Sequence, residues 1–175
     1  MSHLKTKLIL LALLLVLTAG CNSAKKTNSN EIKETDKNII EETKDMTVLN
    51  CSREATAGTG IDVDLKYKIY YTGQYIEILH SVEKITSENQ ESLDEYETAY
   101  KNIYKNYKDL KYYDTTVTRD KNTVINDTTI NYGKIDIDKL LEIEGEEDNI
   151  IKDGKVKVAD WVEFAEKFGT TCEEN

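Results

Sequence analysis

The sequence contains no proline, and its eight glycines stand singly, so it lacks the composition of collagen, mucin-like stalks or glycine-rich low-complexity chains. Basic residues are also scarce: 23 lysines and arginines stand against 33 aspartates and glutamates, a formal net charge of −10 at pH 7. Because nucleic-acid binders need a surplus of lysine and arginine to neutralise phosphates, we expect no nucleic-acid partner. A hydrophobic share of 39% over 175 residues is still compatible with one modest folded domain.

Common catalytic and nucleotide-binding motifs are absent too. The chain has no G-x-S-x-G nucleophile elbow, no Walker A loop and no dinucleotide-binding glycine pattern. After the N-terminal segment the only histidine is His80, which we interpret as a hydrogen-bonded core residue, because zinc sites and Ser-His-Asp arrangements need several convergent groups. A carboxylate pair of the glycosidase type stays open, although nothing marks two acidic residues out. We therefore expect no enzymatic activity, no cofactor and no metal site.

Only one long hydrophobic run is present, Leu8–Leu17, and its ten residues fall short of the roughly 20 that a helix needs to cross a bilayer. Two lysines precede the run and Thr18–Cys21 follows it, which indicates a signal peptide over residues 1–20. The small residues directly before Cys21 resemble the lipobox of bacterial lipoproteins, in which the cysteine receives a diacylglycerol and becomes the mature N-terminus. Thr18 departs from the leucine that is commonest there. Cleavage at another position and an uncleaved anchor are the alternatives.

Lipidation of Cys21 would set both the location and the organisation of the chain. Residues 21–44 are polar, with one alanine and three isoleucines as their apolar residues, so we predict a disordered tether. A single domain is expected over residues 45–175. Without its two signal-peptide lysines the chain carries a net charge of −12, which anionic headgroups repel, so the lipid alone would contact the membrane. We expect a protein anchored on the extracytoplasmic face of the cell membrane.

Alternation of apolar and polar residues opens the predicted domain. It extends over residues 61–71, with Asp62, Asp64, Lys66 and Lys68 on the polar face, and predicts a long, half-buried strand. A turn at 72–74 leads into a second strand over 75–85, and an earlier strand over 47–54 completes a three-stranded meander. In the second strand of this hairpin the alternation places on one face the residues Ile76, Ile78, His80 and Val82.

The period then becomes helical. Apolar residues recur every three or four positions over 89–110 and predict one amphipathic helix. Its tyrosines fit core packing better than a sugar-stacking platform. Residues 112–120 and 123–132 then predict a second hairpin, and a short helix is expected to start near Asp136 or Asp138.

A turn at 152–155 and a last helix over 159–168 complete the chain. These elements predict the α+β class: an antiparallel sheet of about five strands, with one long amphipathic helix and a short C-terminal helix packed on it.

Two cysteines are left for other roles once Cys21 carries lipid. They are Cys51 in the first predicted strand and Cys172 after the last predicted helix. Two cysteines in an exported domain favour a disulfide that joins its two ends. Two free thiols acting as a redox or metal pair are the alternative, but the sequence has neither a C-x-x-C spacing nor a histidine near them.

Residues 149–160 imitate part of a calcium-binding EF-hand loop around Asp153 and Gly154. Ile151 would stand at a ligand position, so a plain turn before the last helix is the preferred interpretation. A neighbouring acidic run could hold calcium loosely, but such a run is usually a solvated loop; it comprises Glu142, Glu144, Glu146, Glu147 and Asp148.

The order of these features resembles the YehR-like family of small bacterial lipoproteins. The resemblance covers residues 45–175 and depends on several segments besides the lipobox and the tyrosine-rich helix: Leu49–Ser52, Leu65–Tyr67, Lys111–Tyr113, Asp136–Leu140 and Gly169–Cys172. It implies a small α+β fold without a known molecular function and without an active site to carry over.

The sequence therefore predicts an exported, lipid-anchored envelope lipoprotein that acts as a non-catalytic binding or interaction module. Its partner would be a small ligand, a wall component or an envelope protein. Two alternatives stay open, namely a cell-envelope enzyme with a cleft of acidic residues and a calcium-dependent surface protein.

Overall fold

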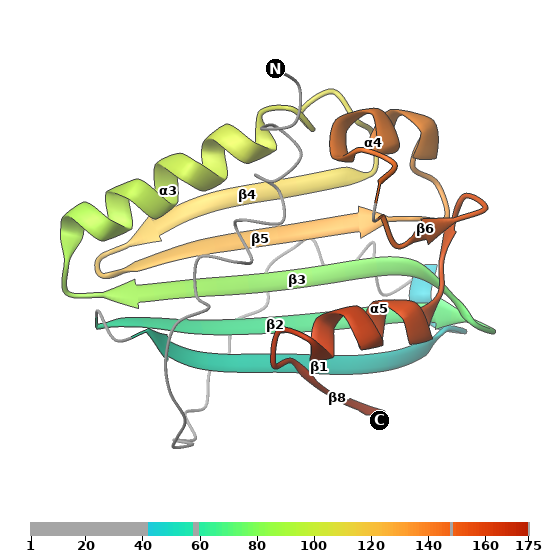
Figure 1. The fold of residues 1–175 in the computed structure, drawn as a ribbon, viewed down its shortest axis with the longest axis horizontal. Coiled ribbons are helices and arrows are strands. Elements are labelled where there is room, and N and C mark those ends of the chain that lie inside the picture. The colour runs from blue at the N-terminus through green and yellow to red at the C-terminus, as the bar shows by residue number, and fades with distance from the viewer. Residues whose placement is uncertain (1–41, 58–59, 148, 175) are drawn as a thin grey trace.

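A computed structural model describes residues 42–57, 60–147 and 149–174 of the chain. Six antiparallel strands form one sheet in the order β4-β5-β3-β2-β1-β8 (Figure 1), and β6 and β7 pair as a separate two-stranded hairpin that contacts β3 through β7. The predicted signal peptide, Cys21 and most of the predicted tether lie outside the described residues. The strands are β1 (Thr47–Ala57), β2 (Ile61–Thr72), β3 (Tyr75–Ser87), β4 (Tyr113–Asp120), β5 (Thr123–Asn131), β6 (Ile151–Lys152), β7 (Lys155–Val156) and β8 (Thr171–Glu174).

Three helices complete the α+β fold and confirm the predicted class. They are α3 (Gln90–Tyr104), α4 (Ile137–Glu144) and α5 (Val158–Glu166). All three contribute buried side chains to the same face of the sheet, for example Leu93, Leu140 and Trp161. We call this the helix face and the opposite side the open face.

The β1–β3 meander follows the predicted alternation closely. Ile61, Val63, Leu65 and Ile69 are buried on the helix face, and a two-residue turn with Gly73 at φ +61° joins β2 to β3. A positive φ at this position favours glycine, because an L side chain strains that backbone conformation. Strand β1 runs three residues past the predicted end at Glu54.

A bulge in β3 changes which residues share a face, and it corrects the prediction for this strand. Ile76 pairs with Tyr71 and Ile78 pairs with Tyr70, so one extra residue, Glu77, is inserted in β3. Ile76 therefore joins the core on the helix face, whereas Ile78 and His80 lie on the open face. An inserted residue reverses the alternation beyond it, and strict period-two counting cannot detect it.

Helix α3 is shorter than predicted. It begins after Asn89, whose side chain accepts a hydrogen bond from Ser92 N, and it ends at Tyr104 instead of Leu110. The following hydrogen bonds span three residues, from Tyr107 N to Tyr104 O and from Leu110 N to Tyr107 O. The apolar spacing of three continues through these turns and buries the same side chains, which is why the pattern resembles a longer helix.

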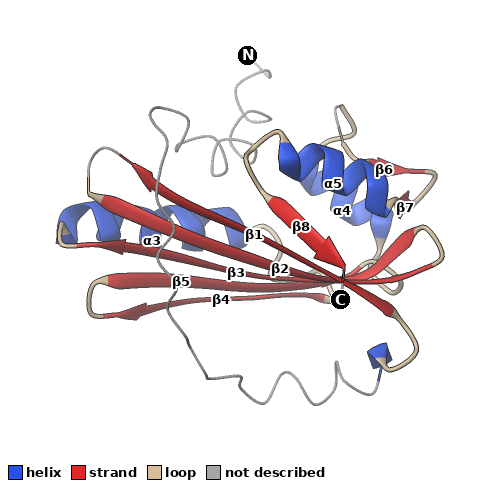
Figure 2. Ribbon diagram, turned by 90° about the horizontal axis from the view of Figure 1, so that it is seen from below, coloured by secondary structure: helices blue, strands red, loops and turns tan. Residues whose placement is uncertain are grey.

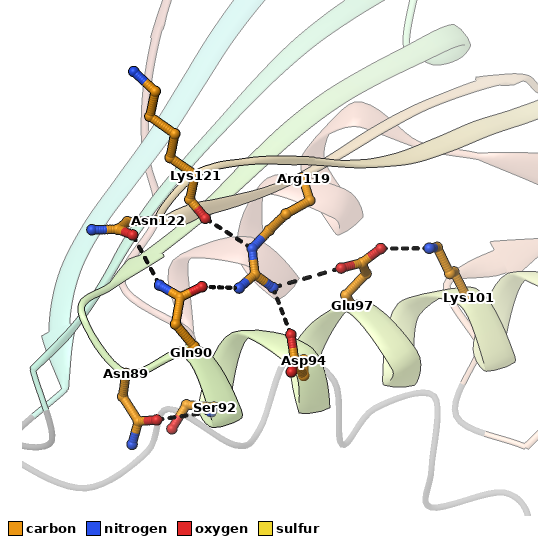
Figure 3. A network of polar contacts seen from close by, with 9 residues as sticks. All are labelled: Asn89, Gln90, Ser92, Asp94, Glu97, Lys101, Arg119, Lys121 and Asn122. Atoms are coloured by element: carbon orange, nitrogen blue, oxygen red, sulfur yellow. Dashed lines mark hydrogen bonds and ion pairs between the residues drawn. The ribbon is translucent and has the colours of Figure 1, made fainter.

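The first turn of α3 is fastened to the tip of the β4–β5 hairpin (Figure 3). Arg119 donates hydrogen bonds to Gln90, Asp94 and the backbone oxygen of Lys121, at 2.6, 3.2 and 3.0 Å. Gln90 donates in turn to Asn122 at 2.9 Å. This network fixes one end of the helix relative to the edge of the sheet.

Strand β8 brings the large sheet to six strands, one more than the five or so predicted. It follows α5 and pairs with β1 over Leu49–Ser52, at the edge opposite β4 (Figure 2). Its four residues are too few for a periodic pattern to show in the sequence. The predicted C-terminal helix is confirmed. It spans Val158–Glu166, so each end lies within two residues of the predicted range 159–168.

Candidate binding surface

The open face is a candidate binding surface, because the three described helices pack on the other side. Strand register places on it every second residue of β1, β2, β3 and β8. A hollow of about 470 Å³ lies over β3, β2, β1 and the edge strand β8. The open-face side chains that line the hollow are Asn50, Ser52, Asp64, Lys66, Lys68, His80, Val82, Lys84, Thr171 and Glu173.

The lining of the hollow contains three lysines. Lys66 forms an ion pair with Asp64, with 3.3 Å between Nζ and Oδ2. The Nζ atom of Lys68 lies 5.9 Å from the centre of the Tyr70 ring, within the range of a cation–π contact. Within the described part of the chain, neither Lys68 nor Lys84 forms an ion pair with a carboxylate.

His80 stands at the side of the hollow next to β5. Its Nε2 atom lies 2.9 Å from Oδ1 of Asp127, and the two side chains are 23% and 47% exposed. The histidine is therefore hydrogen-bonded as expected, but it lies at the sheet surface, so its predicted place in the core is wrong. Among the described residues no hydroxyl or thiol is hydrogen-bonded to His80, and a triad needs such a nucleophile.

The helix face carries a second group of polar residues, beneath α3. The Glu83 carboxylate accepts a hydrogen bond of 2.7 Å from the Tyr100 hydroxyl. Burial raises the pKa of Glu83 most, while the Tyr100 hydrogen bond and the charge of Arg53 lower it. Asn126, which pairs with Glu83 across the strands, donates to the Tyr104 hydroxyl at 2.9 Å. These residues form a polar belt that separates two apolar clusters.

Glu144 is the one described member of the acidic run that the structure draws into the protein. Burial raises its pKa, while hydrogen bonds from Asn149 and Tyr107, at 3.2 and 3.5 Å, lower it. The position of Glu144 shows that the run is not uniformly a solvated loop. Asp148 lies outside the described residues.

The stretch that imitates an EF-hand forms the β6–β7 hairpin. Asp153 and Gly154 have φ values of +52° and +72° and make its two-residue turn, as the preferred interpretation held. In the described ranges, no group of three or more His, Cys, Asp or Glu side chains is arranged to hold a metal ion.

Cys51 and Cys172 form a disulfide in the structure, with 2.10 Å between the sulfur atoms. The two cysteines face each other across β1 and β8, 121 residues apart in sequence. Cys51 is 3% exposed and belongs to the larger apolar cluster. The bond thus ties the short edge strand β8 to the sheet beside the hollow.

Sequence reasoning did not identify the three lysines as a group. Alternation alone put Lys66 and Lys68 on the polar face of their strand, but only the register and the bulge in β3 bring them beside His80 and Lys84. A register between strands depends on tertiary packing, so the sequence held no direct signal for this cluster.

No protein-family model matches the chain, and no curated protein matches it in sequence. Two solved structures are similar to it. The NMR structure of the E. coli YehR protein matches with a TM-score of 0.50 and 17% identity, over 73% of this chain and 90% of that one. An NMR structure of a protein from Streptococcus pneumoniae TIGR4 matches with a TM-score of 0.48 and 13% identity, over 89% and 96% of the two chains.

The match to the E. coli structure defines a shared fold, that of a small α+β domain. At this level of identity it is consistent with the resemblance to the YehR-like family and extends to the fold alone. No described helix is both long enough and apolar enough to span a bilayer.

Proposed function

We propose that this chain is an exported envelope lipoprotein, anchored by lipid on Cys21, whose domain is a non-catalytic binding module that uses the open face of its sheet. The hollow in that face is the observation that carries the binding role. Ligand sites are concave and usually preformed, and this concave surface lies on the side of the sheet that the described helices leave free.

Two further features support export and anchoring. The segment from Leu8 to Cys21 has the composition of a lipoprotein signal peptide. The Cys51–Cys172 disulfide suits an oxidising compartment, because cytosolic thiols are kept reduced. A tether ahead of the domain would hold the open face clear of the membrane surface.

Replacement of the anchor residue tests the proposal directly. Cys21→Ala should move the protein from the membrane fraction to the soluble extracytoplasmic fraction, because the variant lacks the sulfur that would carry the proposed lipid anchor. Intact-mass measurement of the wild type should show loss of residues 1–20 and the added mass of acyl chains. Thr18→Leu, which restores the commonest lipobox residue, is the control and should stay membrane-bound. A Cys21→Ala protein that remains with the membranes would contradict lipid anchoring.

A further inference from the structure

We propose that the hollow in the open face binds a linear phosphate-bearing polyanion through Lys66, Lys68 and Lys84. This inference deepens the proposed function and rests on it. The proposed function leaves the ligand of the open face unspecified, and this inference names its chemical class.

The first step is the arrangement of the cationic side chains. Lys84 lies across from Asp64, Lys66 lies across from Val82, and Lys68 lies across from His80. The three lysines therefore occupy three successive levels of the same face. Each level is two residues, or roughly 6.6 Å, from the next along the strands, so the row extends over about 13 Å. A row of separated charges suits an extended ligand better than a single ion.

The second step is the balance of charge inside the hollow. Asp64 neutralises Lys66, and Asp127 lies against His80. Glu173 stands at the far rim, across Asn50 from Lys68. Lys68 and Lys84 have no carboxylate partner among the described residues, although acidic residues outnumber basic ones by ten in the chain. An anion would supply the missing partners.

The third step is the choice of anion. The chain has two arginines, Arg53 and Arg119, and strand register puts both on the helix face. The open face thus lacks the planar guanidinium fork that recognises carboxylates in pairs of hydrogen bonds. Lysine ammonium groups act as compact point charges, which suit phosphate oxygens. Asn50, Ser52 and Thr171 add neutral polar groups around them.

The net negative charge of the protein limits how such a ligand binds. At physiological ionic strength, charges separated by more than about 8 Å are largely screened, so distant carboxylates oppose a bound polyanion weakly. The attraction to the lysine row is short-ranged and equally sensitive to salt. With about two phosphates neutralised, by Lys68 and Lys84, affinity should fall roughly 7-fold between 50 and 200 mM salt, by the slope that applies to single-stranded polyanions.

Calorimetric titration of the full chain in detergent with a glycerol phosphate oligomer tests this inference. We expect binding at 50 mM salt with the stated salt dependence, and weaker binding of a polyglutamate of equal charge. The double variant Lys68→Gln/Lys84→Gln should lose at least 10-fold in affinity. The matched control Lys105→Gln/Lys111→Gln removes the same two charges from exposed positions after α3 and should bind like the wild type. Circular dichroism should show that all variants remain folded.

Absence of binding at 50 mM salt, or equal losses in both double variants, would overturn the inference. Equal binding of polyglutamate would overturn the assignment to phosphate, and tighter binding of a single-stranded DNA oligomer would replace the proposed ligand with nucleic acid. Membrane fractionation of the Cys21→Ala variant is independent of this titration. A chain that is anchored through Cys21 but does not bind the oligomer would contradict the ligand and leave the anchoring intact.

Discussion

Glu83 is a carboxylic acid beneath a helix, and its environment favours the neutral form. Burial raises its pKa above the ordinary value, so the folded state binds the proton more tightly than the unfolded chain does. This contribution to stability is fully present below the pKa of the unfolded chain, about 4.3, and is lost as pH rises through the raised pKa of the folded protein. At pH 7 an ionised Glu83 therefore opposes folding.

Glu83→Gln should consequently raise the free energy of unfolding at pH 7, because the amide oxygen can still accept the Tyr100 hydrogen bond without a buried charge. The gain over the wild type should shrink as the pH is lowered and disappear near pH 4. Urea unfolding of both proteins at a series of pH values measures this. An advantage that is constant with pH would show that ionisation of Glu83 is not its cause.

Tyr100→Phe is the companion change, and it removes the hydroxyl that donates to Glu83 at 2.7 Å. Loss of a partner from a shielded polar group costs about 1–3 kcal/mol, so this variant should be destabilised at pH 7. The loss should be smaller in the Glu83→Gln background, because a neutral amide needs its partner less than a carboxylate does. Equal losses in the two backgrounds would indicate that the charge of Glu83 does not strengthen its interaction with Tyr100.

At the scale of elements, the first turn of α3 depends on one side chain from the neighbouring hairpin. Arg119 is 20% exposed and joins Gln90, Asp94 and Lys121. Arg119→Ala should lower the free energy of unfolding by about 1–2 kcal/mol, because charge-assisted hydrogen bonds are stronger than exposed ion pairs. Arg119→Lys should recover only part of the loss, since an ammonium group cannot reproduce the fork.

Lys108→Ala is the matched control for Arg119, because its 3.8 Å ion pair with Asp109 is fully at the surface. It should change the free energy of unfolding by less than about 0.5 kcal/mol. Urea unfolding compares the variants, and hydrogen exchange of the α3 amides reports the first turn directly. Unchanged exchange in Arg119→Ala would contradict the anchoring role.

Among the strands and helices, the periodicity of the sequence predicted some features and missed others. Periodicity located the meander, both long hairpins and the start of α3 at Asn89, because each has one buried face and a recognisable turn or cap. It missed the bulge at Glu77 and the end of α3, because an inserted residue and a series of three-residue turns keep an apolar pattern that looks regular. The row of Lys66, Lys68 and Lys84 was missed because it exists only in the register of β2 with β3, which depends on tertiary packing.

At the scale of the whole molecule, one covalent bond joins the first strand to the last. β8 has four residues at the edge of the sheet, and within the described part of the chain it pairs with β1 alone. Such a short edge strand adds few hydrogen bonds, so the Cys51–Cys172 disulfide is its main fastening. Because Thr171 and Glu173 line the hollow, release of β8 would also remove one rim of the open face.

Thiol titration of the folded Cys21→Ala protein should therefore find no reactive cysteine. Cys51→Ser/Cys172→Ser in that background should lose about 2–5 kcal/mol of stability, the usual cost when a small exported domain loses a native disulfide. Hydrogen exchange should then rise in β8 and in the residues of β1 that pair with it, while the β4–β5 hairpin keeps its protection. Two reactive thiols in the parent protein would refute the bond, and uniform loss of protection across the sheet would show that β8 supports the whole fold instead of its own edge.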